Sequence, residues 1–371
     1  MTVLFVTQYG LRAASSRTRV FQYLPFLRQQ GLECRVVTVL PDRGLGGSQV
    51  LVTRSSWRKI LYYIWALGRT CRVGLQLPRL ARDARVLFIQ KVILPAPVRW
   101  WIRRRRLPVV YDFDDAIFTT EVRQRHWLAA WKERRNAAGL PTMLSLARLA
   151  VVENDYTGRY AAAQGPPVLT ITGPIDTVGH QPGPRRTQVG DQVVLGWIGS
   201  ATTLPYLALI TAPLQRLSAR FPGLVLHVVG APEAAFPGVR VVARPWALER
   251  EVADLQGFDI GLMPIPDDPW TRGKGGYKLL QYMAVGLPVV TSPVGVNCRI
   301  VTDGVNGYWA ADDQAWEDRL ARLITDPGAR WAMGQAGRQV VEREFSLAVA
   351  QGRLLQALRD LVATPSPSAL P

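Results

Sequence analysis

The stretch at residues 258–307 reads FDIGLMPIPDDPWTRGKGGYKLLQYMAVGLPVVTSPVGVNCRIVTDGVNG. It opens with the apolar run Phe258–Met263, which predicts a buried strand. Tyr277–Ala284 then places apolar residues on one helical face, and Gly286 can take the left-handed conformation that ends a helix. Pro288–Ser292 predicts a second buried strand. Strand, loop, helix and strand in this order form the unit of a doubly wound parallel sheet.

The loop before this helix has the composition of an anion-binding site. Ligands of doubly wound sheets bind beyond the carboxyl ends of the strands, and a helix N-terminus offers free backbone N–H groups and the positive end of a dipole. Arg272, Lys274 and Lys278 add positive charge around Gly275 and Gly276, where the predicted helix begins. The loop therefore predicts a site for a phosphate or a diphosphate.

The segment GKGGYKLLQYMAVGLPVVTSPVGVN, followed by VTDGVNGYWA, resembles the donor-binding signature of the GT-B glycosyltransferases of family 4, also called group 1. The resemblance covers residues 273–310. It implies an α/β fold of the GT-B type, in which two Rossmann-like doubly wound domains face one another across a cleft. It also implies that a nucleotide sugar binds mainly to the C-terminal domain, and that its sugar is transferred without a bound metal or any other cofactor.

The length of the chain permits two domains with cores of their own. It has 371 residues, of which 48% are hydrophobic. We expect an N-terminal, acceptor-side Rossmann-like domain at residues 1–175 and a C-terminal nucleotide-sugar-binding domain at residues 176–345. The resemblance implies that a last helix, at residues 346–362, packs back on the N-terminal domain. The Pro- and Ser-rich residues 363–371 predict a disordered tail.

The sequence indicates a cytoplasmic protein. Cys34, Cys71 and Cys298 are far apart and show no metal-binding or redox spacing, which suits a reducing compartment. Met1–Val6 runs directly into a strand pattern, so we expect no secretory signal peptide. No apolar run reaches the length that a bilayer-spanning helix needs. A peripheral location on the inner face of the cell membrane is compatible with these features.

The net charge of +17 calls for an anionic partner. The positive charge is concentrated between Arg54 and Arg106. Within this region Trp57–Trp65 repeats apolar residues at helical spacing, and Trp100-Trp101 precede a run of arginines. Basic helices with Trp and Ile are typical of membrane-surface elements, so we expect contact with an anionic membrane or a lipid-linked glycan acceptor. The alternative is a helix that packs on the sheet and exposes a solvated basic face.

An acidic cluster follows the predicted strand Leu107–Tyr111 and contains Asp112, Asp114 and Asp115. Alternation along the strand would place Asp112 and Asp114 on one side and Asp115 on the other. Carboxylates are costly to bury, and close like charges raise the pKa of at least one of them, which suits a general base or an acceptor clamp. The alternatives are a helix-capping pair and a D-x-D metal site as in GT-A glycosyltransferases, which the C-terminal signature disfavours.

Two further groups of candidates lie in the N-terminal half. His126 is a catalytic candidate, although a lone His is more often a surface or core residue. The loop after the first strand lacks the full G-x-G-x-x-G fingerprint, so a dinucleotide site is not supported. The resemblance implies that this loop faces the cleft, where Gly10, Arg17 and Arg19 would approach the donor phosphate or the acceptor. The alternative is a solvated helix start.

A second glycine loop, with Gly199, Ser200 and Thr202, lies between a predicted strand and a predicted helix. Its backbone N–H groups can contact phosphate. The resembled family usually carries an Arg and a Lys in this loop, and this sequence has Ser and Thr instead. The family also commonly has two glutamates where this chain has Gly273 and Gln281. Gln281 can still hydrogen-bond a ribose hydroxyl.

These features predict a glycosyltransferase that moves a sugar from a nucleotide-diphosphate donor to a cell-envelope, polysaccharide or lipid-linked acceptor. The resemblance implies a retaining, metal-independent hexosyltransferase. One alternative is a catalytically silent nucleotide-sugar-binding protein, because a family glutamate is replaced by Gly273. Another is a basic nucleic-acid-binding protein, which only the charge supports. We expect no nucleic-acid partner, because the chain shows no recognisable nucleic-acid-binding motif.

Overall fold

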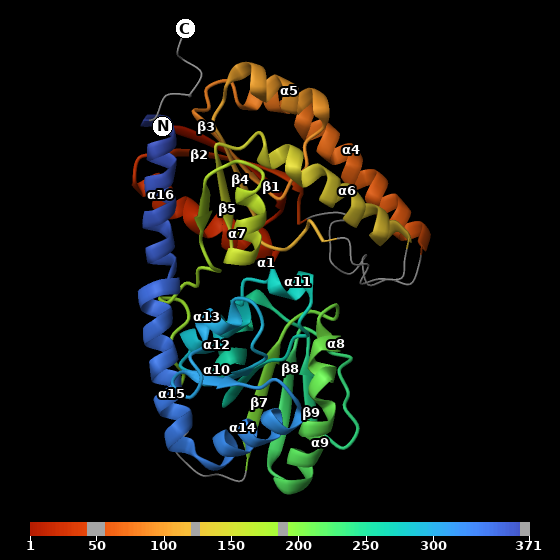
Figure 1. The fold of residues 1–371 in the computed structure, drawn as a ribbon, viewed down its shortest axis with the longest axis vertical. Helices are drawn as coiled ribbons and strands as arrows, with labels where there is room; N and C mark the ends of the chain where they lie inside the picture. The colour runs from red at the N-terminus through yellow and green to blue at the C-terminus, as the bar shows by residue number, and fades with distance from the viewer. Residues whose placement is uncertain (43–55, 120–126, 185–191, 364–371) are drawn as a thin grey trace. The chain divides into compact units, whose positions relative to one another are not determined.

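The computed structural model describes residues 1–42, 56–119, 127–184 and 192–363. The chain divides into two compact units. Met1–Thr172, Gly273–Gly275 and the residues from Ala350 on form the first unit, and Gly173–Arg272 with Gly276–Val349 form the second. Each unit contains one six-stranded sheet with helices on it (Figure 1). The predicted α/β class is confirmed. The predicted tail at 364–371 lies outside the described residues.

The sheet of the first unit has the order β2-β1-β3-β4-β5-β6, and all its neighbouring strands are parallel. Its elements are β1 (Thr2–Tyr9), α1 (Ala14–Arg19), the 3-10 turn η1 (Phe21–Tyr23), α2 (Leu24–Gln29), β2 (Glu33–Leu40), α4 (Ser56–Leu80), β3 (Val86–Gln90), α5 (Ala96–Arg105), β4 (Val109–Phe113), α6 (Trp127–Leu144), β5 (Leu149–Val152), α7 (Asp155–Ala162) and β6 (Val168–Thr170). The last helix, α16 (Leu347–Ala363), begins in the second unit and belongs to the first from Ala350 on.

The sheet of the second unit has the order β12-β11-β10-β7-β8-β9 and is also parallel throughout. Its strands are β7 (Val193–Ile198), β8 (Leu224–Val229), β9 (Val241–Arg244), β10 (Ile260–Met263), β11 (Val289–Thr291) and β12 (Gly307–Trp309). Its helices are α8 (Leu204–Leu207), η2 (Ala208–Ile210), α9 (Thr211–Arg220), η3 (Leu248–Arg250), α10 (Glu251–Gln256), α11 (Pro269–Arg272), α12 (Tyr277–Ala284), α13 (Asn297–Ile300), α14 (Asp313–Thr325), α15 (Pro327–Val340) and the π-helical turn η4 (Val341–Phe345).

Each sheet has one point at which the strand order reverses. In the first unit the chain adds β2 on one side of β1 and β3 on the other, and in the second unit it adds β8 and β10 on opposite sides of β7. Loops that leave the carboxyl ends of strands at such a point diverge, and ligands of open α/β sheets bind there. The strand order therefore predicts that ligands bind at the loops after β1 and β3 in the first unit, and at those after β7 and β10 in the second.

Both faces of the second sheet are covered, as expected for parallel strands. Along β7, Leu195 and Trp197 belong to one buried apolar cluster, whereas Val194 and Ile198 belong to another. This alternation holds β7 rigidly between two layers of helices, so that the loop after Ile198 starts from a fixed position.

The stretch that decides the fold forms the elements that its pattern predicts. Helix α12 has the predicted bounds. Strand β10 begins two residues later than predicted, and β11 is one residue shorter than predicted at each end. Gly286 has a φ of +76° just after the helix, so the predicted left-handed helix end is confirmed. No helix in the described part of the chain is both long and apolar enough to cross a bilayer.

Candidate functional site

In the loop after β7, the backbone packs closely against neighbouring segments and lies beside a lysine. The N–H of Gly199 donates to the Val229 carbonyl at 2.9 Å. A side chain at Gly199 would lie 2.7 Å from Nζ of Lys278, and one at Gly230 would collide with the Gly199 carbonyl. The Lys278 ammonium lies 4.1 Å from the centroid of the buried Trp197 ring, a cation–π contact. The structure therefore brings two of the predicted donor residues, Gly199 and Lys278, together.

Backbone groups of this loop are available to an anion. The N–H groups of Ala201 and Thr202 make no hydrogen bond to any residue that the structure describes. The Ser200 N–H is engaged by the Thr203 hydroxyl at 3.2 Å, and the Ser200 and Thr202 hydroxyls lie 2.7 Å apart. Successive free N–H groups beside an ammonium are the elements of an anion-binding turn.

A second candidate element is the start of α12. Gly276 caps this helix with a φ of +66°, a conformation that glycine adopts without strain. Gln281, the predicted ribose ligand, is buried on the same helix. Sequence reasoning missed Asn297, whose amide donates to Thr291 Oγ1 at 2.8 Å and whose buried Oδ1 has no hydrogen-bond partner among the described residues. The signal was its position at the start of the short helix α13, just after the loop that follows β11.

Arg272 is engaged by its own neighbours. Its Nε and Nη2 donate to Asp267 at 2.6 and 3.0 Å, and both side chains are about half exposed. The neighbouring Asp268 accepts the N–H of Thr271 at 2.7 Å and so caps α11. A carboxylate partner offsets the Arg272 charge, and a contribution of Arg272 to diphosphate binding stays a prediction.

In the first unit, a buried ion pair joins α1 to the end of β4. Arg19 and Asp112 are each only 1% exposed. Arg19 Nε and Nη2 donate to Asp112 Oδ2 at 3.0 and 2.5 Å, and Nη1 donates to the Ile171 carbonyl at 2.6 Å. Burial raises the pKa of Asp112 to about 6, although the Arg19 charge opposes this shift. Arg19 is therefore not a solvated residue of a helix start, because acceptors within the unit hold its guanidinium.

The other two aspartates share one lysine. Lys91 follows β3 with a φ of +61°, which is costly for a residue with a side chain. Its Nζ lies 2.6 Å from Asp114 Oδ1 and 2.7 Å from Asp115 Oδ2. Burial lowers the pKa of Lys91, but Asp114 and Asp115 raise it more, so that it ends well above its ordinary value. The alternation expected for the two aspartates does not apply, because β4 already ends at Phe113.

Sequence reasoning also missed Lys91 and Glu153 as members of this cluster. Glu153 follows β5, and its Oε1 lies 3.6 Å from Nη1 of Arg19. Burial raises the pKa of Glu153 to about 8, against the effect of Arg19. The signal for both residues was an ionisable side chain placed directly after a buried strand.

Lys274 and Gly275 belong to the first unit and pack on the residues after β5. The Asn154 amide donates to the Lys274 carbonyl at 2.9 Å. A side chain at Gly275 would collide with the Glu153 carboxylate in its present position. The contact places the backbone of the predicted donor residue Lys274 beside the carboxyl end of β5.

The remaining predicted residues of the first unit are less informative. Gly10 is buried against Asp42, whose carboxylate would collide with any side chain at that position. Arg17 lies on α1, partly exposed, with Nη1 3.4 Å from the Arg12 carbonyl. His126 lies outside the described residues. Among the described residues, no group of three or more His, Cys, Asp and Glu side chains is arranged to hold a metal ion.

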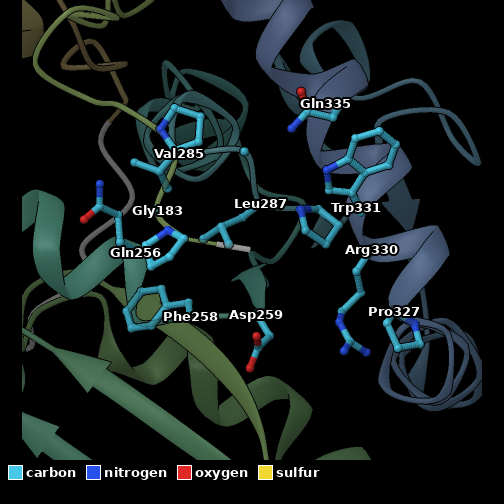
Figure 2. A pocket seen from close by; sticks show the side chains of 14 residues that line it. Gly183, Gln256, Phe258, Asp259, Val285, Leu287, Pro327, Arg330, Trp331 and Gln335 are labelled. Carbon is cyan, nitrogen blue, oxygen red and sulfur yellow. The ribbon is translucent and has the colours of Figure 1, made fainter. Parts of the chain in front are cut away.

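A separate pocket of about 140 Å³ lies at the other edge of the second sheet (Figure 2). Asp259 precedes β10 and Pro288 precedes β11, so the pocket is at the amino ends of these strands. Arg330 in its wall donates Nη1 to the Leu323 and Ile324 carbonyls at 2.6 and 3.0 Å. The pocket is therefore distinct from the loops at the carboxyl edge.

Comparison with known proteins finds a family to which most of the second unit is similar. Residues 192–326 match the family model described as "Glycosyl transferases group 1". These residues are therefore similar to the group 1 glycosyltransferases, and they are called the group 1 domain below. The predicted resemblance is confirmed, and the Gly199 loop, Lys278 and Gln281 all lie within this group 1 domain.

Curated relatives agree with this assignment. The chain is 29% identical over 218 residues to a D-inositol 3-phosphate glycosyltransferase of Actinosynnema mirum, covering 51% of this chain and 50% of the relative. It is 32% identical over 181 residues to the protein of that name from Kribbella flavida, covering 43% and 42%. An alpha-maltose-1-phosphate synthase of Mycobacterium tuberculosis is 35% identical over 96 residues, covering 24% and 25%. The chain spans about half the length, or less, of the curated relatives that it matches.

Solved structures confirm the GT-B fold over the whole chain. The sucrose-phosphate synthase of Thermosynechococcus elongatus superposes with a TM-score of 0.73 at 14% identity, covering 98% of this chain and 99% of that one. HepE of Anabaena, solved in complex with UDP-glucose, gives a TM-score of 0.67 at 13% identity, covering 97% and 100%. At these identities the likeness concerns the fold.

Proposed function

We propose that this chain is a glycosyltransferase that moves a hexosyl group from a nucleotide-diphosphate sugar to an acceptor hydroxyl. The observation that carries the proposal is the loop after β7 in the group 1 domain. Free N–H groups of Ala201 and Thr202 and the Lys278 ammonium beside Gly199 suit a diphosphate. The activities for which the curated relatives are named, and the UDP-glucose bound to HepE, support a nucleotide-sugar donor.

The transfer needs three events at the sugar. The bond between C1 and the diphosphate oxygen breaks, a bond between C1 and the acceptor oxygen forms, and the acceptor hydroxyl loses its proton. Lys278, Lys274 and the N–H groups of the Gly199 loop would stabilise the negative charge on the leaving diphosphate, so the proposed reaction uses no metal ion. The proposed role of Asp112, Asp114 and Asp115 is to bind the acceptor and to accept the proton of its hydroxyl. We propose retention at C1, as the family resemblance implies.

The proposed acceptor is a cell-envelope, polysaccharide or lipid-linked glycan, and the proposed location is cytoplasmic, at the inner face of the cell membrane. The charge of the chain, +17, favours an anionic acceptor or support. TarM of S. aureus, a structural neighbour with a TM-score of 0.58 at 11% identity, was solved with UDP and alpha-GlcNAc-glycerol. That pairing supports a nucleotide-sugar donor together with a glycan acceptor.

A thermal-shift screen of nucleotide sugars tests the proposal. A ligand of the folded state raises the melting temperature by mass action, so the donor should stand out among related nucleotides. The donor that binds is then assayed for release of its nucleotide diphosphate, with and without a chelator. Binding with neither transfer nor hydrolysis would favour the catalytically silent alternative. Absence of any shift across the panel would reject the nucleotide-sugar site.

A further inference from the structure

Three helices of the first unit expose tryptophan side chains. Trp57 on α4 is 62% exposed, Trp100 on α5 is 61% exposed and Trp131 on α6 is 44% exposed. Helices α4 and α5 pack together, and the Tyr63 ring of α4 lies 6.5 Å from the Trp131 ring of α6. The three helices therefore form one layer on the first unit (Figure 1).

Helix α4 is apolar on two faces. Tyr62, Val73 and Leu77 are buried and fix one face to the unit. The exposed residues Trp57, Leu61, Ile64 and Leu75 recur at spacings that place them on another face. A surface helix of a globular protein normally turns polar residues to water, and a contiguous exposed apolar patch indicates an interaction site.

Positive charge surrounds this apolar face. Each exposed tryptophan has an arginine over its ring, with Arg58 5.5 Å from the centroid of Trp57, Arg104 5.7 Å from Trp100 and Arg135 5.9 Å from Trp131. Neither α4 nor α5 contains an acidic residue. The exposed basic residues on and just after these two helices are Arg58, Arg72, Arg79, Arg82, Arg103, Arg104, Arg105 and Arg106, and the exposed Asp83 also follows α4.

We infer that this Trp–Arg surface, formed by the exposed residues of α4, α5 and α6 named above, docks on an anionic lipid bilayer. The tryptophans and aliphatic side chains would enter the interface between headgroups and acyl chains, while the arginines contact lipid phosphates. At such a bilayer the proposed transferase would meet a lipid-linked acceptor. This role of the surface rests on the proposed function.

The chemistry favours a bilayer over two other occupants. Nucleic acid offers phosphates to the arginines, but it gives Leu61, Ile64 and Leu75 no apolar medium to enter. A second copy of the chain would bring a surface of the same charge against this one, which is unfavourable. An anionic bilayer complements the charge and the apolar side chains together.

Co-sedimentation of the full chain with vesicles tests the inference. We expect binding to vesicles of phosphatidylcholine with phosphatidylglycerol, little binding to phosphatidylcholine alone, and release as the salt concentration rises. Arg104→Gln should weaken binding to the anionic vesicles about fivefold, the effect of roughly one basic contact near the surface. Parent protein that stays in the supernatant at low salt would overturn the inference.

A matched pair of variants separates docking from general charge. Leu61→Glu should lower the partition coefficient about tenfold or more, because it loses apolar burial and adds repulsion. Leu209→Glu makes the same change at a leucine of similar exposure in the second unit and should bind as the parent does. Both residues are exposed, so melting temperatures should stay near that of the parent. Equal binding of the two variants would overturn the inference.

The same preparations distinguish the other occupants and the proposed function. Salt-sensitive binding to duplex DNA without vesicle binding would assign the surface to nucleic acid, and a dimer abolished by Leu61→Glu would assign it to a second copy. Either result overturns the bilayer. The donor-induced thermal shift, measured beside these assays, reports the nucleotide-sugar site separately, so either idea can fail alone.

Discussion

The carboxyl edges of the two sheets differ in their chemistry, although both sheets are parallel, have six strands and reverse their strand order once. In the first unit this edge is filled by ionisable side chains that contact one another, namely Arg19, Lys91, Asp112, Asp114, Asp115 and Glu153. In the group 1 domain the edge is formed by close-packed glycines, free N–H groups and the Lys278 ammonium. Strand order places the edge, and the residues directly after the strands decide its charge.

This difference in charge suggests that the two edges bind different substrates. An edge with more carboxylates than cations disfavours a diphosphate and can accept a proton from a hydroxyl. An edge of N–H groups and an ammonium favours a diphosphate. Under the proposed function, the first edge serves the acceptor and the second serves the donor.

Breaking the Arg19–Asp112 pair should have the largest effect. Arg19→Met should lower the free energy of unfolding by about 3–5 kcal/mol, because it leaves the buried Asp112 carboxylate without its partner. Arg216→Met removes an arginine from the exposed Arg216–Glu317 pair and should cost no more than about 1 kcal/mol. Denaturant unfolding of both variants measures the contrast. Similar decreases in the free energy of unfolding would show that the buried pair stabilises the fold no more than the exposed one.

The pH dependence of stability should report Glu153. Its pKa is about 8 in the folded chain and 4.5 in the reference state, so the folded chain holds the proton over this interval. The free energy of unfolding should therefore fall as pH rises from about 4.5 to about 8, by a few kcal/mol at about 1.4 kcal/mol per pKa unit. Glu153→Gln should flatten this fall, and Glu342→Gln, at an exposed carboxylate, should not. A parent curve that rises over this interval would contradict the assignment.

Asp114→Asn separates catalysis from structure at the acidic edge. We expect donor affinity to stay nearly unchanged and turnover to fall about a hundredfold or more, the usual scale for a lost general acid or base. The exposed control Asp83→Asn should turn over as the parent does. A capping role predicts a stability loss near 1 kcal/mol with turnover intact, and a metal role predicts a response of the parent to a chelator. Surviving turnover would make His126 the next residue to test.

The smallest effect is expected at the two lysines proposed to bind the donor. Lys278→Met should weaken donor binding by about 1.5–3 kcal/mol, the range for hydrogen bonds to charged groups, and Lys274→Ala by a similar amount. Arg319→Met also removes a cation from an aromatic ring in the second unit, at Tyr308, and should leave donor affinity unchanged. Calorimetric titration measures all three. Unchanged affinity in either lysine variant would remove that lysine from the donor site.

The sequence by itself determined the α/β class, the strand–loop–helix unit at residues 258–307 and the resemblance to the group 1 glycosyltransferases. These features are local: apolar periodicity marks α12, and Gly286 supplies the backbone conformation that ends it. Because residues after a parallel strand lie at one edge of the sheet, the sequence also indicated that Asp112 and Gly199 belong to such edges.

The tertiary structure alone decided which side chains meet at those edges. Arg19 and Asp112 are 93 residues apart in sequence, and they pair because α1 follows β1 while β4 lies beyond β3 in the strand order. Lys91 reaches both aspartates through a left-handed backbone that periodicity does not reveal. Packing likewise decided that α4 buries Tyr62 and Leu77 and leaves Trp57, Leu61 and Ile64 in water. A repeat of apolar residues predicts a helix face, but only the neighbouring elements determine whether that face is covered.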